Sequence, residues 1–202
     1  EFSGVDGYGD SGSLIANGSL ELDLNSDTEP DGWDHDTGSH NGTISSSSSY
    51  NGDYHYRIDA ETAENGFQTS CFPVSDAQTY YIDLYAKAAA GVLSHMDINY
   101  MEYSTRANCE ADSAAGVGVV TSGLTTSTSW AEFGGSYSPD TGALWLKFEI
   151  ENNDLSSGTN QDLYIDAVRV WYNTTTGAGG LDLAETHPMD KDDEIELGQI
   201  VS

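Results

Sequence analysis

Basic residues are scarce in this chain, which has 6 Lys plus Arg against 34 Asp plus Glu and a formal net charge of −28. Nucleic-acid binding requires a basic surface that neutralises phosphates, so this balance argues against that class and against anionic membrane surfaces. Runs of 18 apolar residues are absent from the sequence, which therefore predicts no membrane-spanning helix. Three explanations of the acidity remain open: an acid-rich extracellular surface, a high-salt habitat with strong screening, or cation binding.

Cysteine is also scarce, with Cys71 and Cys109 as the two examples. In a secreted chain such a pair most simply forms one disulfide bond, and two free buried thiols are the alternative. The five histidines are scattered, without the Cys/His spacing typical of zinc sites. The sequence begins at Glu1 without an initiator Met, so we expect a mature or excised piece of an extracellular or cell-surface protein.

What the chain does contain is short alternating runs separated by Gly, Asn, Asp and Ser. The clearest is 79–88, where every second residue is apolar, as expected of a half-buried strand. In 143–151 the same alternation turns Trp145, Lys147 and Glu149 away from the core. The pattern predicts an all-β, antiparallel β-sandwich (jelly roll) of nine or ten strands without a helix. The expected strands are 14–24, 43–47, 54–59, 67–74, 79–88, 95–103, 117–120, 130–137, 143–151 and 163–172.

Composition divides the chain into four parts. Residues 1–13 are rich in Gly, Ser and Asp and are expected to form a flexible leader, followed by the sandwich over 14–172. A Thr/Gly linker is predicted at 173–180. The acidic tail, 181–202, ends in a possible pairing strand at 195–201.

The order of these signals resembles a carbohydrate-binding module of the family 4/9/22 type, a jelly roll with a galactose-binding-domain-like fold. The resemblance covers 14–172. In the family, the closing strand usually carries two adjacent acids, and here Ala167 stands in the second place. The matching stretches are Asn17-Gly18-Ser19-Leu20-Glu21, Pro30-Asp31-Gly32-Trp33, 79–88, Trp130, Leu144-Trp145-Leu146-Lys147-Phe148 and Tyr164-Ile165-Asp166-Ala167-Val168.

The resemblance implies a structural calcium ion (Ca²⁺) shared by the first and last strands. Its ligands would be the carboxylates of Glu21 and Asp166, with the carbonyl of Ser19. Oxygen ligands suit this hard cation, and acids inside otherwise apolar strands are costly without a partner. Both acids being solvated strand residues is the alternative. We therefore expect the opening and closing strands to be neighbours.

The resemblance also implies a sugar-binding face, because Trp33, Tyr54, Tyr103 and Glu149 fall near ligand-contacting positions. Trp145 joins them because alternation turns its ring outward. Flat, rigid aromatic rings can stack on the apolar faces of sugars at little entropic cost. Two alternatives remain: Trp33 as a core plug beneath its turn, and Trp145 covered by a loop.

Four further aromatic residues are placed by the strand patterns. Trp130 and Trp171 are expected in the core or at a sheet edge. Tyr81 and Tyr85 point outward from the strand at 79–88. They line either the same face as Trp145 or the opposite one.

These features predict non-catalytic binding of a polysaccharide or surface glycan by a secreted, calcium-stabilised β-sandwich. Such a domain would be an accessory module of a glycoside hydrolase or of a surface protein. With 34 acids, a carboxylate pair at glycosidase spacing can always be imagined, and no motif singles one out. The alternative is a structural subunit of an extracellular filament or surface layer. Copies of the chain would then join through strand addition of the tail at 195–201.

Overall fold

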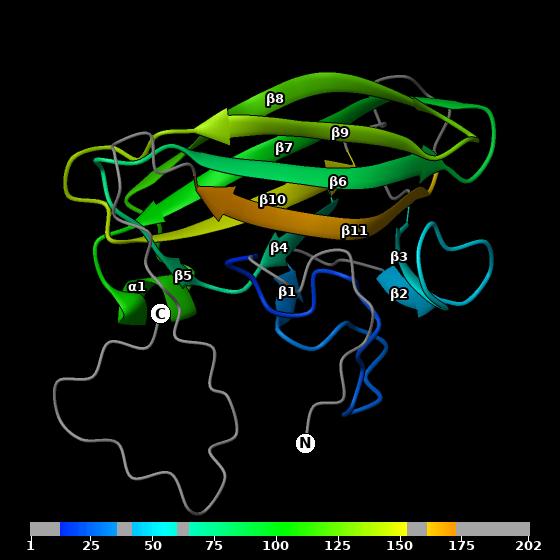
Figure 1. The fold of residues 1–202 in the computed structure, drawn as a ribbon, viewed down its shortest axis with the longest axis horizontal. Helices are drawn as coiled ribbons and strands as arrows, with labels where there is room; N and C mark the ends of the chain where they lie inside the picture. The colour runs from blue at the N-terminus through cyan, green and yellow to red at the C-terminus, as the bar shows by residue number, and fades with distance from the viewer. Residues whose placement is uncertain (1–12, 36–41, 60–64, 153–160, 173–202) are drawn as a thin grey trace, which may run out of the picture.

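The computed structural model describes residues 13–35, 42–59, 65–152 and 161–172. They form two antiparallel sheets that pack face to face, and β6 and β11 pass in front of β7 and β10 in Figure 1. The six-stranded sheet has the order β1-β4-β10-β7-β8, with β5 also paired to β10. Its strands are β1 (Trp33–His35), β4 (Asn65–Thr69), β5 (Phe72–Pro73), β7 (Val92–Tyr103), β8 (Gly116–Ser127) and β10 (Trp145–Asn152).

The five-stranded sheet has the order β2-β3-β11-β6-β9. Both β2 and β9 are therefore edges of this sheet, and β11 lies at its centre. A central position suits β11 because it begins and ends with apolar residues. Its strands are β2 (Gly42–Ser45), β3 (His55–Ile58), β6 (Tyr80–Ala88), β9 (Ala131–Tyr137) and β11 (Leu163–Tyr172). The predicted antiparallel β-sandwich is confirmed.

The core lies between the sheets and is built by strand alternation. In β6 the five residues expected on one face are all at most 2% exposed, from Tyr80 to Ala88. In β10, Phe148 and Ile150 are fully buried. Phe67 of β4 stacks between Trp33 and Tyr56, with ring centroids 4.6 and 3.9 Å away, and so ties the two sheets together. Buried aromatic pairs of this kind contribute roughly 0.5–1.5 kcal/mol beyond their area.

The expected first strand, 14–24, is wrong as a strand. Two backbone hydrogen bonds connect it to β11, Leu14 N to Val170 O and Val168 N to Gly18 O, both 2.7 Å. The chain turns between and just after these two bonds, because Asn17 and Leu20 adopt positive φ of 50° and 60°. Positive φ breaks the pleat on which an alternating pattern depends. The predicted neighbourhood of the opening and closing stretches is nevertheless confirmed.

The segment 104–128 differs most from expectation. It contains a short helix, α1 (Arg106–Glu110), whose first turn is capped by the Thr105 side chain accepting from Asn108 N. It also contains all of β8, which is twelve residues long instead of the expected four. Gly, Ser and Thr dominate β8, so its sequence resembles a loop, and pairing with the whole length of β7 makes it a strand.

Smaller differences concern the strand ends. β1 was not expected as a strand, and the run 67–74 is interrupted between β4 and β5. Leu144 precedes β10 and is 55% exposed, although alternation placed it in the core. In the described ranges, no helix is long and apolar enough to cross a membrane. The leader up to residue 12, the linker and the tail lie outside the described residues, so their assignments and tail-mediated filament assembly stay predictions.

Cys71 and Cys109 form the expected disulfide, with Cα atoms 6.1 Å apart. Cys109 lies in α1 and is fully buried with Met101 and Tyr103 in a small cluster on the outer side of the six-stranded sheet. The bond therefore ties α1 to the segment between β4 and β5.

Replacing both cysteines by serine should lower the free energy of unfolding by about 4 kcal/mol, because the bond closes a loop with a sequence separation of 38. Urea denaturation of the double variant and of reduced wild type measures this loss. The two should agree. An unchanged midpoint in both would show that the bond contributes nothing to stability.

Candidate functional site

The two acids expected to share calcium converge on one turn. Asp166 Oδ2 accepts hydrogen bonds from Tyr50 N (2.7 Å) and Asn51 N (3.0 Å), and its Oδ1 accepts from Ala167 N (2.6 Å). Glu21 Oε1 accepts from Asp53 N (3.1 Å) and Tyr54 N (3.0 Å), and Asp53 N also lies 3.2 Å from Oε2. Carboxylates from both ends of the chain thus hold the turn at 50–54.

Asp166 is fully buried. Burial raises its pKa to about 6, the three backbone N–H groups act in the opposite direction, and the nearby Glu21 charge raises it further. The two acids therefore repel each other electrostatically while they hold the same turn. This repulsion is the kind that a bound cation relieves.

The donor set fits calcium in part. Carboxylate oxygens and the buried Ser19 are of the right chemical type, but three N–H groups already occupy Asp166 and two occupy Glu21. A carboxylate offers about four acceptor positions and calcium takes six to eight oxygens, so carbonyls or water would have to complete the shell. Among the described residues, no group of three or more His, Cys, Asp or Glu is placed to hold a metal.

The outer face of the six-stranded sheet carries most of the predicted sugar-binding residues. The register pairs Trp145 with Tyr103 and Glu149 with Asn99, so these four side chains share one face of β10 and β7. Glu149 is also paired with Gln68 of β4. The predicted outward orientation of Trp145 and Glu149 is thereby realised in one surface.

A row of amide and carboxylate groups crosses this face. Gln68 Nε2 donates to Glu149 Oε1 (3.3 Å), and Asn99 Nδ2 donates to Glu149 Oε2 (3.2 Å) and Glu151 Oε2 (2.8 Å). Lys147, which is 3% exposed, donates to Gln68 Oε1 (3.1 Å). We call these five residues the polar row. Their mutual hydrogen bonds fix the direction of each group before any ligand binds.

The aromatic residues of the same face are partly covered. Tyr103 is fully buried, and its hydroxyl donates to Asp112 Oδ1 (2.7 Å). Burial raises the pKa of Tyr103, and its hydrogen bond with Asp112 raises it further. Trp145 is half-buried against the disulfide cluster, with the Arg106 guanidinium 5.7 Å from its ring centroid. Tyr103 therefore supports the surface from below, while part of the Trp145 ring remains accessible.

A cavity of about 310 Å³ lies beside the row, between β1 and α1. Charged side chains of both signs line it, including Asp34, Arg106 and Lys147. Lys147 Nζ lies 3.7 Å from Asp34 Oδ2 and 3.5 Å from Asp112 Oδ1, so the buried ammonium is compensated by two acids.

The remaining two predicted residues, Trp33 and Tyr54, do not belong to the polar row, although Trp33 lies in β1 of the same sheet and lines the cavity beside the row. Trp33 is 7% exposed, and its Nε1 donates to Asn17 O (3.1 Å). It is therefore buried beneath its turn, as the core-plug alternative expected, and Phe67 covers one ring face. A sugar contact of Trp33 stays a prediction. Tyr54 is 40% exposed but belongs to the turn before β3, in the other sheet.

The five-stranded sheet also carries an aromatic outer face, to which Tyr81 and Tyr85 belong, so they lie on the face opposite Trp145. Trp130 and Trp171 are not core residues; both are partly exposed. Tyr50 stacks on Tyr85 at 3.6 Å, and the Trp130 ring lies edge-on to Tyr50. The Lys87 ammonium sits 4.6 Å from the Trp130 centroid. Strict alternation in β6 was the available signal, since it turned Tyr81 and Tyr85 outward.

Comparison with solved structures supports the fold alone, because the sequence identities are below 20%. The CBM22-1 xylan-binding domain of Paenibacillus barcinonensis Xyn10C superposes with a TM-score of 0.56 and 14% identity, covering 80% of this chain and 95% of that domain. A family 16 carbohydrate-binding module superposes with a TM-score of 0.54 and 18% identity, over 78% and 98%. The CBM22-1-GH10 modules of Clostridium thermocellum xylanase 10B, solved with xylohexaose, give 0.58 and 12%, over 80% and 28%.

No protein-family model matches the sequence, and no curated protein matches it. The chain thus has the jelly-roll fold found in carbohydrate-binding modules, as the sequence resemblance implied.

His55 in β3 should make the stability of the folded protein depend on pH. It is fully buried, and neither ring nitrogen has a hydrogen-bond partner in the described structure. Burial lowers its pKa to about 4, and the charges of Lys87 and Arg57 lower it further. The unfolded state, with an ordinary pKa near 6.5, binds more protons between these values. Stability should therefore fall by on the order of 3 kcal/mol as pH falls from about 6.5 to about 4.

His55→Phe should remove that fall and leave stability at pH 7 equal or higher, because Phe keeps the ring and loses no hydrogen bond. Denaturant unfolding between pH 4 and pH 7 compares the two proteins. The raised pKa of Asp166 acts in the opposite sense in this window but is common to both. Parallel pH profiles for variant and wild type would contradict the prediction.

Proposed function

We propose that this chain binds carbohydrate without catalysis, on the outer face of the six-stranded sheet. The observation that carries the proposal is the polar row, in which Gln68, Asn99, Glu149 and Glu151 form a connected line across three neighbouring strands. Sugars present many hydroxyl groups that each donate and accept. A line of fixed amides and carboxylates is complementary to a chain of such hydroxyls.

The row and its surroundings offer a sugar both polar hydrogen-bonding groups and an apolar surface. Glu149 and Glu151 accept from sugar hydroxyls, and hydrogen bonds to ionised groups are roughly twice as strong as neutral ones. Asn99 orients both carboxylates, because its Nδ2 donates to Glu149 Oε2 and to Glu151 Oε2. At the end of the row, the accessible part of Trp145 offers an apolar surface for the C–H face of a sugar ring.

Two of the structural neighbours support a neutral backbone polysaccharide as the ligand class. One is described as xylan-binding, and another was solved with xylohexaose. The formal charge of −28 also disfavours polyanionic glycans. We therefore propose xylan-like or glucan-like chains, bound by a secreted or cell-surface protein whose disulfide suits an oxidising compartment.

Glu149→Gln should weaken binding about tenfold and Trp145→Ala by a similar factor, because each removes one ligand contact worth about 1–2 kcal/mol. Affinity electrophoresis in soluble xylan, β-glucan and mannan, and titration with xylohexaose, measure the change. Asp76→Asn, in the turn between β5 and β6, is the matched control that alters charge away from the row. If the wild-type protein migrates without retardation in gels containing each of these glycans, the proposal is wrong.

The proposal includes a structural calcium ion held by Glu21, Asp166 and the Ser19 carbonyl. Its support is the convergence of two carboxylates, one of them fully buried, on the single turn at 50–54. The backbone beside both acids also takes unusual conformations, with positive φ at Leu20 (60°) and Ala167 (49°). Such conformations concentrate at functional sites, where surrounding contacts compensate their strain. The ion would supply charge compensation and tie the N-terminal segment to β11.

Calcium at a hundredfold excess over its dissociation constant should raise the melting temperature by roughly 5–10 °C relative to EDTA. Calorimetry of wild type and of Glu21→Gln tests this, since the amide keeps one oxygen acceptor for the turn but loses the charge. The rise should be much smaller in the variant. Equal melting temperatures of wild type in calcium and EDTA would mean that backbone N–H groups alone hold the turn.

A further inference from the structure

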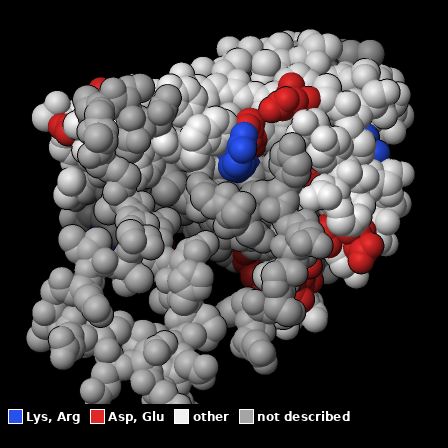
Figure 2. All heavy atoms as spheres, in the orientation of Figure 1, with Lys and Arg blue, Asp and Glu red and all other residues white. Residues whose placement is uncertain are grey.

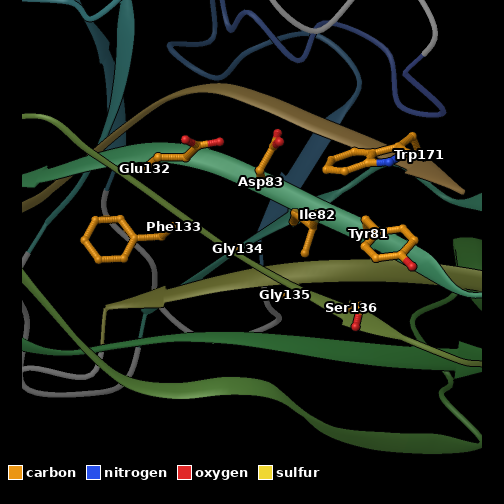
Figure 3. Close-up of a pocket in the computed structure, with 9 residues that line it drawn as sticks. All are labelled: Tyr81, Ile82, Asp83, Glu132, Phe133, Gly134, Gly135, Ser136 and Trp171. Atoms are coloured by element: carbon orange, nitrogen blue, oxygen red, sulfur yellow. The ribbon is translucent and has the colours of Figure 1, made fainter. Parts of the chain in front are cut away.

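A second hollow lies on the opposite side of the sandwich, on the outer face of the five-stranded sheet. It has a volume of about 520 Å³, within the range of small-ligand sites, and runs along β6 and β9. We call it the β6–β9 trough. Figure 3 shows the residues that line it, which come from β6, β9 and β11. Ile82 is buried, whereas Asp83 and Trp171 are partly exposed and Glu132 is exposed, which places these three on the outer face.

One wall of the trough is a stacked aromatic pair. Tyr81 and Trp171 are directly opposite each other on β6 and β11, with ring centroids 5.4 Å apart and planes 16° from parallel. The Arg169 guanidinium lies 4.4 Å from the Trp171 centroid and forms a 2.6 Å ion pair with Asp83. Figure 2 shows Lys or Arg atoms beside Asp or Glu atoms near the middle of the face turned to the viewer. These contacts hold both rings in place before any ligand arrives.

The floor and the far wall belong to β9. Gly134 has no side chain where a Cβ would meet Ile82 O, so β9 approaches β6 closely and leaves the space above open. Three groups around this space make no hydrogen bond within the described part of the chain: the Glu132 carboxylate, the Ser136 hydroxyl and the Tyr81 hydroxyl. Both Glu132 and Ser136 are exposed.

We propose that the β6–β9 trough is a second glycan-binding site, which takes a neutral pyranose ring of an oligosaccharide. The apolar face of the ring packs on Tyr81 and Trp171. Its hydroxyls donate to Glu132 and exchange hydrogen bonds with Ser136. Because Arg169 is already paired with Asp83, the trough has a net negative charge and disfavours uronic acids.

The ligand class rests on the function proposed for the polar row, but the site is separate. The row lies on the outer face of one sheet and the trough on the outer face of the other, with the whole core between them. One short oligosaccharide cannot touch both. Loss of either site therefore leaves the other measurable.

Titration of ¹⁵N-labelled protein with xylohexaose, cellohexaose, mannohexaose and a galacturonate hexamer tests the proposal. Each added sugar is followed by amide shifts, and affinities are fitted separately for residues of β6/β9 and of β10/β7. Ser136→Trp blocks the trough from an edge strand that tolerates large aromatics. Glu132→Gln removes one charged acceptor, Glu149→Gln perturbs the polar row, and Asp76→Asn is the charge control.

With at least one neutral hexamer, shifts should appear in β6 and β9, vanish in Ser136→Trp and show about tenfold weaker affinity in Glu132→Gln. They should persist in Glu149→Gln and Asp76→Asn, and be absent with galacturonate. Shifts confined to β10 and β7 and unaffected by Ser136→Trp would overturn the second site while supporting the polar row. Shifts confined to β6 and β9 would support the trough and overturn the row, and no shifts with any neutral hexamer would overturn both.

Discussion

The hold of Asp166 and Glu21 on the turn at 50–54 is the interaction on which the rest of this structure depends. A fully buried carboxylate is costly unless it is hydrogen-bonded, and Asp166 meets that cost with three backbone N–H groups. In doing so it joins the centre of β11 to a turn more than a hundred residues away. Glu21 adds the N-terminal segment to the same turn, so three distant stretches are fixed at one point.

That junction also shapes the aromatic surface of the five-stranded sheet. Tyr50, whose N–H binds Asp166, stacks on Tyr85 and reaches Trp130. The backbone carbonyl of Ser48 accepts from both Trp130 Nε1 (3.0 Å) and Lys87 Nζ (3.1 Å). The turn before β3 is therefore a cover over part of this sheet. It leaves the region around Tyr81 and Trp171, at the other end of β6, as the open part.

Local alternation made much of the fold predictable. The strands 79–88 and 163–172 matched β6 and β11 within a residue because their buried and exposed positions differ strongly in polarity. The length of β8 was underestimated because Gly, Ser and Thr differ little in polarity and so show no clear alternation. Pairing with β7 decides its structure. The first stretch failed for a different reason: positive φ at Asn17 and Leu20 cannot be deduced from an alternating pattern.

The candidate site was predictable to the extent that side-chain direction follows from a strand. Trp145 and Glu149 were placed outward, and the register put Asn99 and Gln68 beside Glu149, which no local pattern could reveal. Both readings of Trp33 stayed open at the sequence level because a Trp after a turn can enter the core as easily as leave it. Trp171 was assigned to the core or an edge, whereas the bulge of β11 between Asp166 and Arg169 turns it to the surface.

The contact between β8 and β9 has a consequence for self-association. Thr121 Oγ1 reaches Gly134 O at 3.4 Å, and a Cβ on Gly135 would meet the side chains of Val120 and Thr121. These edge strands of the two sheets thus shield each other, and the sandwich is nearly sealed along that seam. A strand from a neighbouring molecule would have to separate β8 from β9 before it could pair with either of them, so this seam protects both edges from strand addition.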